Sequence, residues 1–155
     1  ISSSGKETRR HSSGSPAEYA TEYLAGRLAM EDVEKAAEWF QNLPASVVSE
    51  QSASALLPHW YARDPEGVTR WINELTPGLA RDEVARVFVG ELLDQDPLAA
   101  AGWADTIQDP AIKQDVALKV LSNLRTAHPA EGREWLEQLT GVDPEWHARM
   151  LRKVR

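Results

Sequence analysis

Hydrophobic residues in this chain recur at helical spacing within short segments, and one of these segments occurs several times. In residues 64–75, the side chains of Val68, Trp71 and Leu75 fall on one face of a helix. The Asp-Pro pair at its start suits a helix terminus, because aspartate can cap free backbone N–H groups and proline fits the first turn. The pattern therefore predicts a short amphipathic helix with a defined start.

The same signals predict about nine helices and no strand along the whole chain. The expected N-cap residues are Ser15, Asp32, Ser46, Asp64, Asp96, Asp109, His128 and Asp143. The expected helices cover residues 16–30, 33–43, 47–62, 65–75, 79–94, 97–107, 110–124, 129–139 and 144–154. Turn residues, among them Pro44 and Thr76-Pro77-Gly78, separate neighbouring helices. On the first helix we expect an apolar face made of Ala20, Tyr23, Leu24 and Leu28.

These helices follow a period of 32 residues, which the tryptophans mark most clearly. Equivalent positions on the shorter helices are Trp39, Trp71, Trp103 and Trp135, followed four residues later by Leu43, Leu75, Ile107 and Leu139. Equivalent positions on the longer helices are Leu24, Leu56, Phe88 and Val120. The last helix fits the series only with an insertion of two residues near Gly141-Val142. The sequence therefore predicts an all-α solenoid of antiparallel helix pairs, in which each unit packs on its neighbours.

The four aligned tryptophans have two interpretations. They could form an aromatic ladder that binds sugars or stacks on bases, or they could be one core position that recurs in each unit. A leucine or isoleucine one turn later favours the core interpretation, because repeated apolar positions at helical spacing usually face a core. Each indole N–H then needs a hydrogen-bond partner that the sequence does not identify.

Composition sets the broad class. A chain of 155 residues with 42% hydrophobic residues is long enough for one domain with a real core. No apolar run approaches the roughly 20 residues of a membrane span, and no signal peptide is visible. The chain begins with Ile1 rather than methionine, so we expect a processed form or a piece of a longer protein. It has no cysteine, which excludes disulfides and thiolate chemistry but leaves the compartment undetermined.

Charge is divided unevenly between a short tail and the helical body. Residues 1–15 are rich in serine and carry a net charge of +2, so we expect a flexible linker or tail. The full chain has a net charge of −7, which leaves −9 for the helical repeat domain at residues 16–155. Nucleic acid and anionic membranes both require a basic surface, so neither is an expected partner.

No constellation of catalytic or metal-binding residues is present. The four histidines are His11, His59, His128 and His147, and none belongs to a His-x-x-x-His pattern. The serines near residue 50 lack the glycines of a nucleophile elbow, and there is no glycine-rich phosphate loop. We therefore predict a non-enzymatic chain with no metal and no cofactor.

A polar column runs along the shorter helices, opposite their apolar stripe. Its members lie one residue before or two residues after the tryptophan: Glu38, Gln41, Arg70, Asn73, Asp105, Glu134 and Glu137. These residues are the candidate partner-binding set, suited to an extended peptide with basic or amide groups. The alternative is an ordinary solvated face that keeps the protein soluble.

The repeat resembles known helical arrays. A helix-turn-helix unit of this length is similar to the tetratricopeptide-like superfamily of α-solenoids, although its period is shorter than the 34 residues of that motif. The pattern D-P-(x)5-W-(x)3-L, seen at Asp64–Leu75, also resembles alanine- and tryptophan-rich repeats of uncharacterised bacterial proteins. The resemblance covers residues 16–155 and implies protein or peptide binding, with no particular site residues.

Three functions remain open from the sequence. The leading hypothesis is a helical-repeat scaffold for protein or peptide interaction, because the repeat is clear and catalytic motifs are absent. The second is a structural spacer or self-assembly module, since the first repeat unit is only half complete. The third is a regulatory arm of an enzyme that is encoded elsewhere in a longer parent chain.

Overall fold

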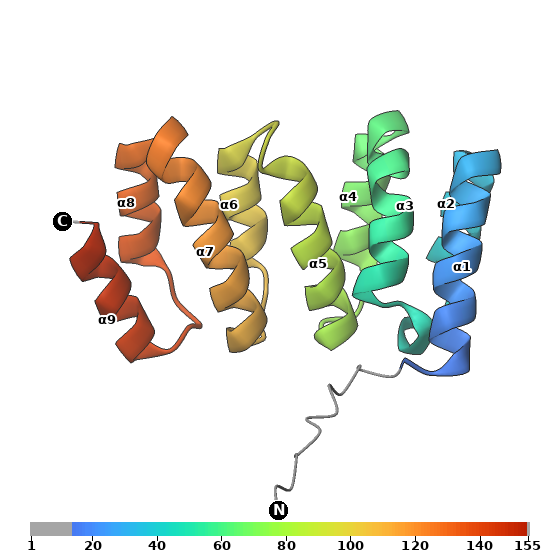
Figure 1. Ribbon diagram of the computed structural model, residues 1–155, viewed down its shortest axis with the longest axis horizontal. Coiled ribbons are helices and arrows are strands. Elements are labelled where there is room, and N and C mark those ends of the chain that lie inside the picture. The colour runs from blue at the N-terminus through green and yellow to red at the C-terminus, as the bar shows by residue number, and fades with distance from the viewer. Residues whose placement is uncertain (1–13, 155) are drawn as a thin grey trace, which may run out of the picture.

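The computed structural model describes residues 14–154, and within them it contains nine α-helices and no β-strand (Figure 1). The longer helices are α1 Pro16–Glu31, α3 Glu50–Arg63, α5 Leu79–Leu92 and α7 Pro110–Ala127. The shorter helices are α2 Val33–Gln41, α4 Pro65–Glu74, α6 Pro97–Asp105, α8 Pro129–Gln138 and α9 Pro144–Lys153, with a 3₁₀ turn, η1, at Ala45–Val47. The all-α prediction is confirmed for this part of the chain. All but the last two residues of the predicted serine-rich tail, 1–15, lie outside the described residues.

Asp-Pro pairs start several of the helices as the sequence predicted. The carboxylates of Asp64, Asp96 and Asp109 accept hydrogen bonds from backbone N–H groups three residues later, at 3.0, 3.1 and 3.0 Å. Ser15 caps α1 and forms a reciprocal capping box with Glu18. These bonds satisfy N–H groups that have no partner inside the helix, so the caps fix where each helix begins.

Two of the predicted caps behave differently. Helix α3 begins at Glu50, because Ser49 and Ser52 form a capping box there, and the 3₁₀ turn precedes it. The prediction that Ser46 caps this helix was therefore wrong. His128 stands at the N-cap of α8, but its imidazole makes no capping hydrogen bond. The free backbone N–H groups at this helix start therefore lack the side-chain acceptor that aspartate gives to other helices.

The helices stand in a row, with each one packed on its neighbours in the chain (Figure 1). The longer helices also pack on one another, α1 on α3, α3 on α5 and α5 on α7. In the view of Figure 1 they form the front of the molecule, and α2, α4 and α6 lie behind or beside them. This arrangement is compatible with a helical-repeat fold.

Apolar side chains gather in two clusters. The larger extends from α1 to α7 and includes the fully buried Phe40, Leu56 and Phe88. The smaller contains Leu121, Leu136 and other residues of α7, α8 and the C-terminal segment. The last helix therefore belongs to a separate core, which matches its irregular place in the sequence pattern.

The apolar face predicted for α1 was wrong for Ala20, Tyr23 and Leu24, which are exposed, whereas Leu28 packs against the core as predicted. Thr21, Ala25 and Ala29 are the buried residues of this helix, whereas Tyr23 and Leu24 are 63% and 44% exposed. The small residues face inward because α1 packs on α2 and α3 from one side only. The large residues are left on the opposite side, where no helix of the described chain covers them.

Asp82 is a buried carboxylate that the sequence did not single out. It is 2% exposed, and its two oxygens accept hydrogen bonds from the backbone N–H groups of Gln108 and Asp109 at 3.2 and 2.9 Å. Both donors lie in the connection from α6 to α7. Asp82 therefore fixes this connection to α5, with one buried charge satisfied by two donors.

Candidate functional site

The aligned tryptophans occupy one face of the shorter helices, but they are not equally buried. Trp71 is 4% exposed, with its ring centroid 5.2 Å from that of Phe40 and 5.4 Å from that of Trp60. Trp39, Trp103 and Trp135 are half-buried. Only Trp71 is thus fully enclosed, and the other indoles have an edge that is accessible from the surface.

A groove of about 550 Å³ lies between α4 and α6 and uses one of these half-buried indoles. Its apolar side includes Tyr61, Phe88 and Trp103. The Phe88 ring makes edge-to-face contacts with Tyr61 and Trp103, at centroid distances of 5.5 and 5.0 Å. This geometry is favoured between aromatic rings and holds Tyr61 and Trp103 in place against a buried phenylalanine. The groove therefore has an aromatic floor that packs on Phe88.

Polar side chains from α4 form the other side of this groove. Arg70 and Asn73, two of the predicted partner-binding residues, line it together with Glu66 and Thr69. Asp96, the N-cap of α6, lines it as well. The groove thus combines aromatic surface with hydrogen-bonding groups of both kinds.

Another groove, of about 440 Å³, lies beside α2, next to the end of α3 and the start of α4. In chain order this is the first groove, and the groove between α4 and α6 is the second. Glu38 and Gln41, two further predicted residues, line it with Glu34. The apolar part includes the indole of Trp60, and Arg63 supplies one positive charge. Four of the predicted residues are therefore placed in two grooves.

The two grooves use corresponding positions of the sequence. Five residues of α2 line the first, and the residues 32 positions later in α4 line the second; Glu38 thus corresponds to Arg70 and Gln41 to Asn73. Trp60 corresponds in the same way to Leu92, so only Arg63 among the residues lining the first groove has no counterpart in the second. The two grooves therefore share corresponding positions of α2 and α4, whereas Tyr61, Phe88, Ala99 and Trp103 line only the second.

The remaining predicted residues lie outside both grooves. Asp105 accepts a hydrogen bond at 3.1 Å from the indole N–H of Trp135. Glu134 and Glu137 are exposed on α8. The structure therefore divides the predicted set: α2 and α4 contribute residues to a groove, whereas those of α6 and α8 do not line either one.

The carboxyl of Asp105 has a perturbed pKa. Partial burial raises the pKa of its carboxyl above the ordinary value, and this effect outweighs the hydrogen bond from Trp135 and the charge of Lys113, which lower the pKa. The carboxylate is thus used in an internal contact and is partly withdrawn from solvent.

The histidine and carboxylate side chains of residues 14–154 are the remaining candidates for site chemistry. No cluster of three His, Asp or Glu side chains there is placed to hold a metal ion. His59 is exposed, and a ring nitrogen of His147 forms a hydrogen bond with the carbonyl oxygen of Leu136. No helix in the described part is long and apolar enough to cross a membrane.

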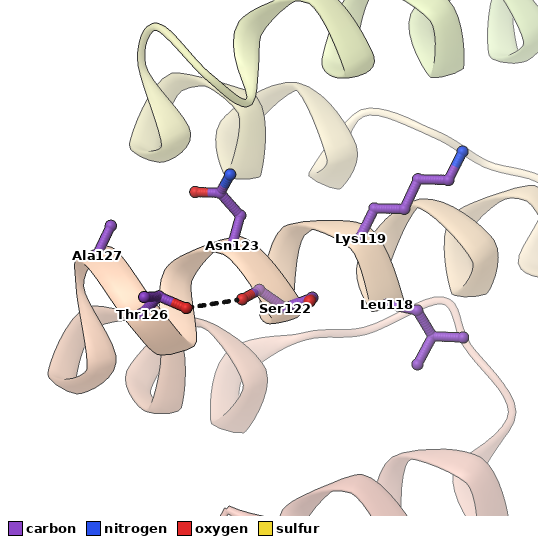
Figure 2. Close-up of a pocket in the computed structure, with 6 residues that line it drawn as sticks. All are labelled: Leu118, Lys119, Ser122, Asn123, Thr126 and Ala127. Carbon is purple, nitrogen blue, oxygen red and sulfur yellow. Dashed lines mark hydrogen bonds between the residues drawn. The ribbon is translucent and has the colours of Figure 1, made fainter.

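A further hollow, of about 700 Å³, lies along α7 and lacks an opposing wall. Figure 2 shows the side chains that line it, and all belong to that one helix. They include Ser122 and Thr126, whose hydroxyl donates to the Ser122 carbonyl at 3.5 Å. Because a single helix surface supplies every contact, this hollow could not enclose a ligand.

Comparison with known proteins adds no assignment. No protein family, curated protein or solved structure gives a significant match to the chain.

Proposed function

We propose that this chain is a non-enzymatic helical-repeat scaffold that binds an extended peptide segment of a partner protein. In this proposal the helix pairs form a tetratricopeptide-like α-solenoid with a 32-residue repeat. The observation that carries it is the pair of grooves along α2 and α4, lined by side chains at corresponding positions. Repeated grooves allow one extended chain to contact successive units, because each unit presents the same positions to its ligand.

The charges that line the grooves favour a partner with basic residues. The first groove carries Glu34, Glu38 and Asp64 against Arg63. The second carries two carboxylates, Glu66 and Asp96, against one arginine. A lysine or arginine of the partner would complement this excess of negative charge, and an aromatic or aliphatic side chain would fill the aromatic floor of the second groove.

Selection from a library of linear random peptides tests this proposal. We expect peptides that combine basic residues with an apolar anchor, and we expect the E34K/E38K variant to bind them at least about tenfold more weakly, a loss of about 1.4 kcal/mol. The matched control is E134K/E137K, which makes the same charge change on α8 outside the grooves. Failure to enrich any peptide, or equal weakening by both variants, would argue against the grooves as the site.

A second candidate function is self-association, which the outer face of α1 favours. Leu24 is 44% exposed, whereas Leu56, Phe88 and Val120, which occupy the corresponding positions on the later long helices, are almost fully buried. Tyr23, next to it on the outer side of α1, is 63% exposed. Contact between copies through this side of α1 would therefore cover apolar surface.

Sedimentation equilibrium distinguishes this candidate. Self-association through α1 predicts a molar mass that rises with protein concentration and becomes that of a monomer in the L24K variant. A monomer at every concentration in the wild-type chain would exclude self-association and leave the peptide-binding proposal untouched.

A further inference from the structure

The C-terminal end of the helix row contains a cavity that no sequence pattern predicted. Successive long helices pack on one another as far as α7, but α9 packs chiefly on α8. A cavity of about 460 Å³ lies between α7, α8 and α9. Its volume falls within the range typical of small-molecule sites in proteins.

The connection before α9 explains why the packing changes. Helix α8 ends at Gln138, its C-cap Leu139 has an extended backbone, and Gly141 has a φ of 76°, in the left-handed region that favours glycine. A new helix then starts at Pro144, capped by Asp143. This connection contains the two residues by which the last unit exceeds the others in the sequence alignment. The longer connection separates α9 from the position that the repeat would give it.

Aliphatic side chains form the apolar part of the cavity. They are Leu118 and Leu121 of α7 together with Met150 and Val154 from the C-terminal segment. Leu118 is 45% exposed, and Figure 2 shows its side chain on the side of α7 opposite to Lys119 and Asn123. An apolar ligand in the cavity would cover these groups, with a gain of roughly 25 cal/mol for each Å² of apolar surface removed from water.

Cations supply all the charge that lines this cavity. Arg125 of α7, Arg133 of α8 and Lys153 of α9 line it, and no aspartate or glutamate does. None of the three takes part in the ion pairs found within residues 14–154. Three cations at one place are unusual in a chain whose net charge is −7, and they create a local positive field.

We propose that this cavity binds a small amphiphilic carboxylate, an anion with an aliphatic tail. The tail would lie against Leu118, Met150 and Val154. The carboxylate would accept hydrogen bonds from the guanidinium groups of Arg125 and Arg133, whose planar donors match carboxylate geometry. The site is separate from the grooves of α2 and α4, so this inference does not depend on peptide binding there.

The charges that line the two grooves and the C-terminal cavity predict where an anion binds. The grooves beside α2 and α4 carry an excess of carboxylates and would repel an anion, whereas the C-terminal cavity would attract it. An amphiphilic carboxylate should therefore bind at the C-terminal end only. A ligand that simply sought any apolar surface would show no such preference.

Titration of the ¹⁵N-labelled protein with octanoate tests the proposal by nuclear magnetic resonance. Octanoate is added below its micellar concentration. Two controls accompany it: acetate, which keeps the carboxylate, and 1-hexanol, which keeps an aliphatic tail without the charge. We expect saturable shift changes confined to α7, α8 and α9 with octanoate, and affinities at least about tenfold weaker with either control, because each lacks one half of the recognition.

Variants assign the binding to the cavity. The R125Q/R133Q variant should bind octanoate at least about tenfold more weakly, whereas R149Q/R152Q, which removes two exposed cations of α9 outside the cavity, should bind it as the wild type does. L118Q, a change at an exposed position, should also weaken binding. Circular dichroism of each variant confirms that the fold is retained.

Two results would overturn the proposal. One is the absence of saturable shifts at α7–α9 in the wild-type protein. The other is equal octanoate affinity in R125Q/R133Q and R149Q/R152Q, since that would show that general positive charge, not the cavity, attracts the anion.

Discussion

The indole N–H of Trp135 donates a hydrogen bond to the carboxylate of Asp105 at 3.1 Å and so connects α8 to α6. The corresponding residues one unit earlier are Trp103 and Asn73, and both of these line the open groove between α4 and α6. The same pair of positions thus makes an internal contact in one unit and lines a groove in the preceding one. Within the polar column, Asp105 therefore has a structural role, whereas Asn73 belongs to the candidate binding residues.

Replacing Asp105 with asparagine should change how stability depends on pH. The folded-state pKa of Asp105 is raised above the ordinary 3.8, so the folded wild-type protein holds this proton more tightly than the unfolded chain. Its contribution to stability therefore decreases as pH rises from 3.8 through the folded pKa. D105N keeps an oxygen that can accept from Trp135 and removes this dependence. In urea unfolding between pH 4 and 7, the free energy of unfolding of D105N should rise relative to that of the wild type as pH rises. A difference between the two that does not change with pH would contradict the assignment.

Trp135→Phe removes the donor of the same bond and keeps the aromatic ring. We expect a loss of about 1 kcal/mol in the free energy of unfolding, the typical net value of one hydrogen bond. In the D105A variant the acceptor is already absent, so adding W135F should lower the free energy of unfolding very little further. A double-mutant cycle measures this coupling. Full additivity of the two changes would show that the bond contributes nothing.

Removing the carboxylate of Asp82 should destabilise the protein strongly. D82A leaves the N–H groups of Gln108 and Asp109 without their acceptor in a buried place, which we expect to cost about 2–4 kcal/mol. D82N should be intermediate, because its amide offers one acceptor oxygen in place of two. E83A, at the half-buried neighbouring position, is the control and should change stability by less than about 1 kcal/mol. Urea unfolding of the three variants checks this order.

Trp71→Ala should cost about 3–5 kcal/mol, as large truncations in a core do. The reason is that its indole is almost fully enclosed and contacts both Phe40 and Trp60. The equivalent change at the half-buried Trp39 should cost less, because part of that ring stays in contact with solvent. Equal losses in thermal and urea unfolding would mean that the aligned tryptophans have one common role.

Two glycine substitutions should change stability in opposite directions. G141A forces a left-handed conformation on alanine and places its Cβ 3.2 Å from the Lys113 ammonium, so it should destabilise by about 1–2 kcal/mol. G102A lies in α6, where an added Cβ meets nothing within 4 Å, and should stabilise by about 0.5–1 kcal/mol. Urea unfolding of both variants measures the signs.

Helix number and most helix starts could be predicted because they depend on local signals. The Asp-Pro pairs cap and begin helices within three residues of themselves, so Asp64 and Asp96 identify their helices without knowledge of the fold. The start of α3 could not be chosen in this way, because Ser46 and Ser49 are both plausible caps. The exposed face of α1 depends on which helices pack there, which is a tertiary property that periodicity alone does not determine.

The candidate site was predicted only in part. Glu38 and Arg70 could be found because exposed polar positions on a helix follow from the same periodicity as the core. Tyr61 and Trp103 were missed as groove residues, because an aromatic residue at helical spacing indicates a core, and only the spacing between α4 and α6 leaves their edges accessible. The C-terminal cavity results from how α9 packs after an insertion, and the cations that line it come from three different helices, which periodicity along one helix does not bring together.

The most direct test of peptide binding in the grooves is to map a selected peptide onto the chain by nuclear magnetic resonance. The ¹⁵N-labelled protein is titrated with a peptide from the library selection, and shift changes are assigned by residue. We predict that they concentrate on α2, α4 and α6, including Glu38, Arg70 and the indole N–H of Trp103. Saturable changes confined to the long helices α3, α5 and α7, with α2 and α4 unaffected, would contradict the account.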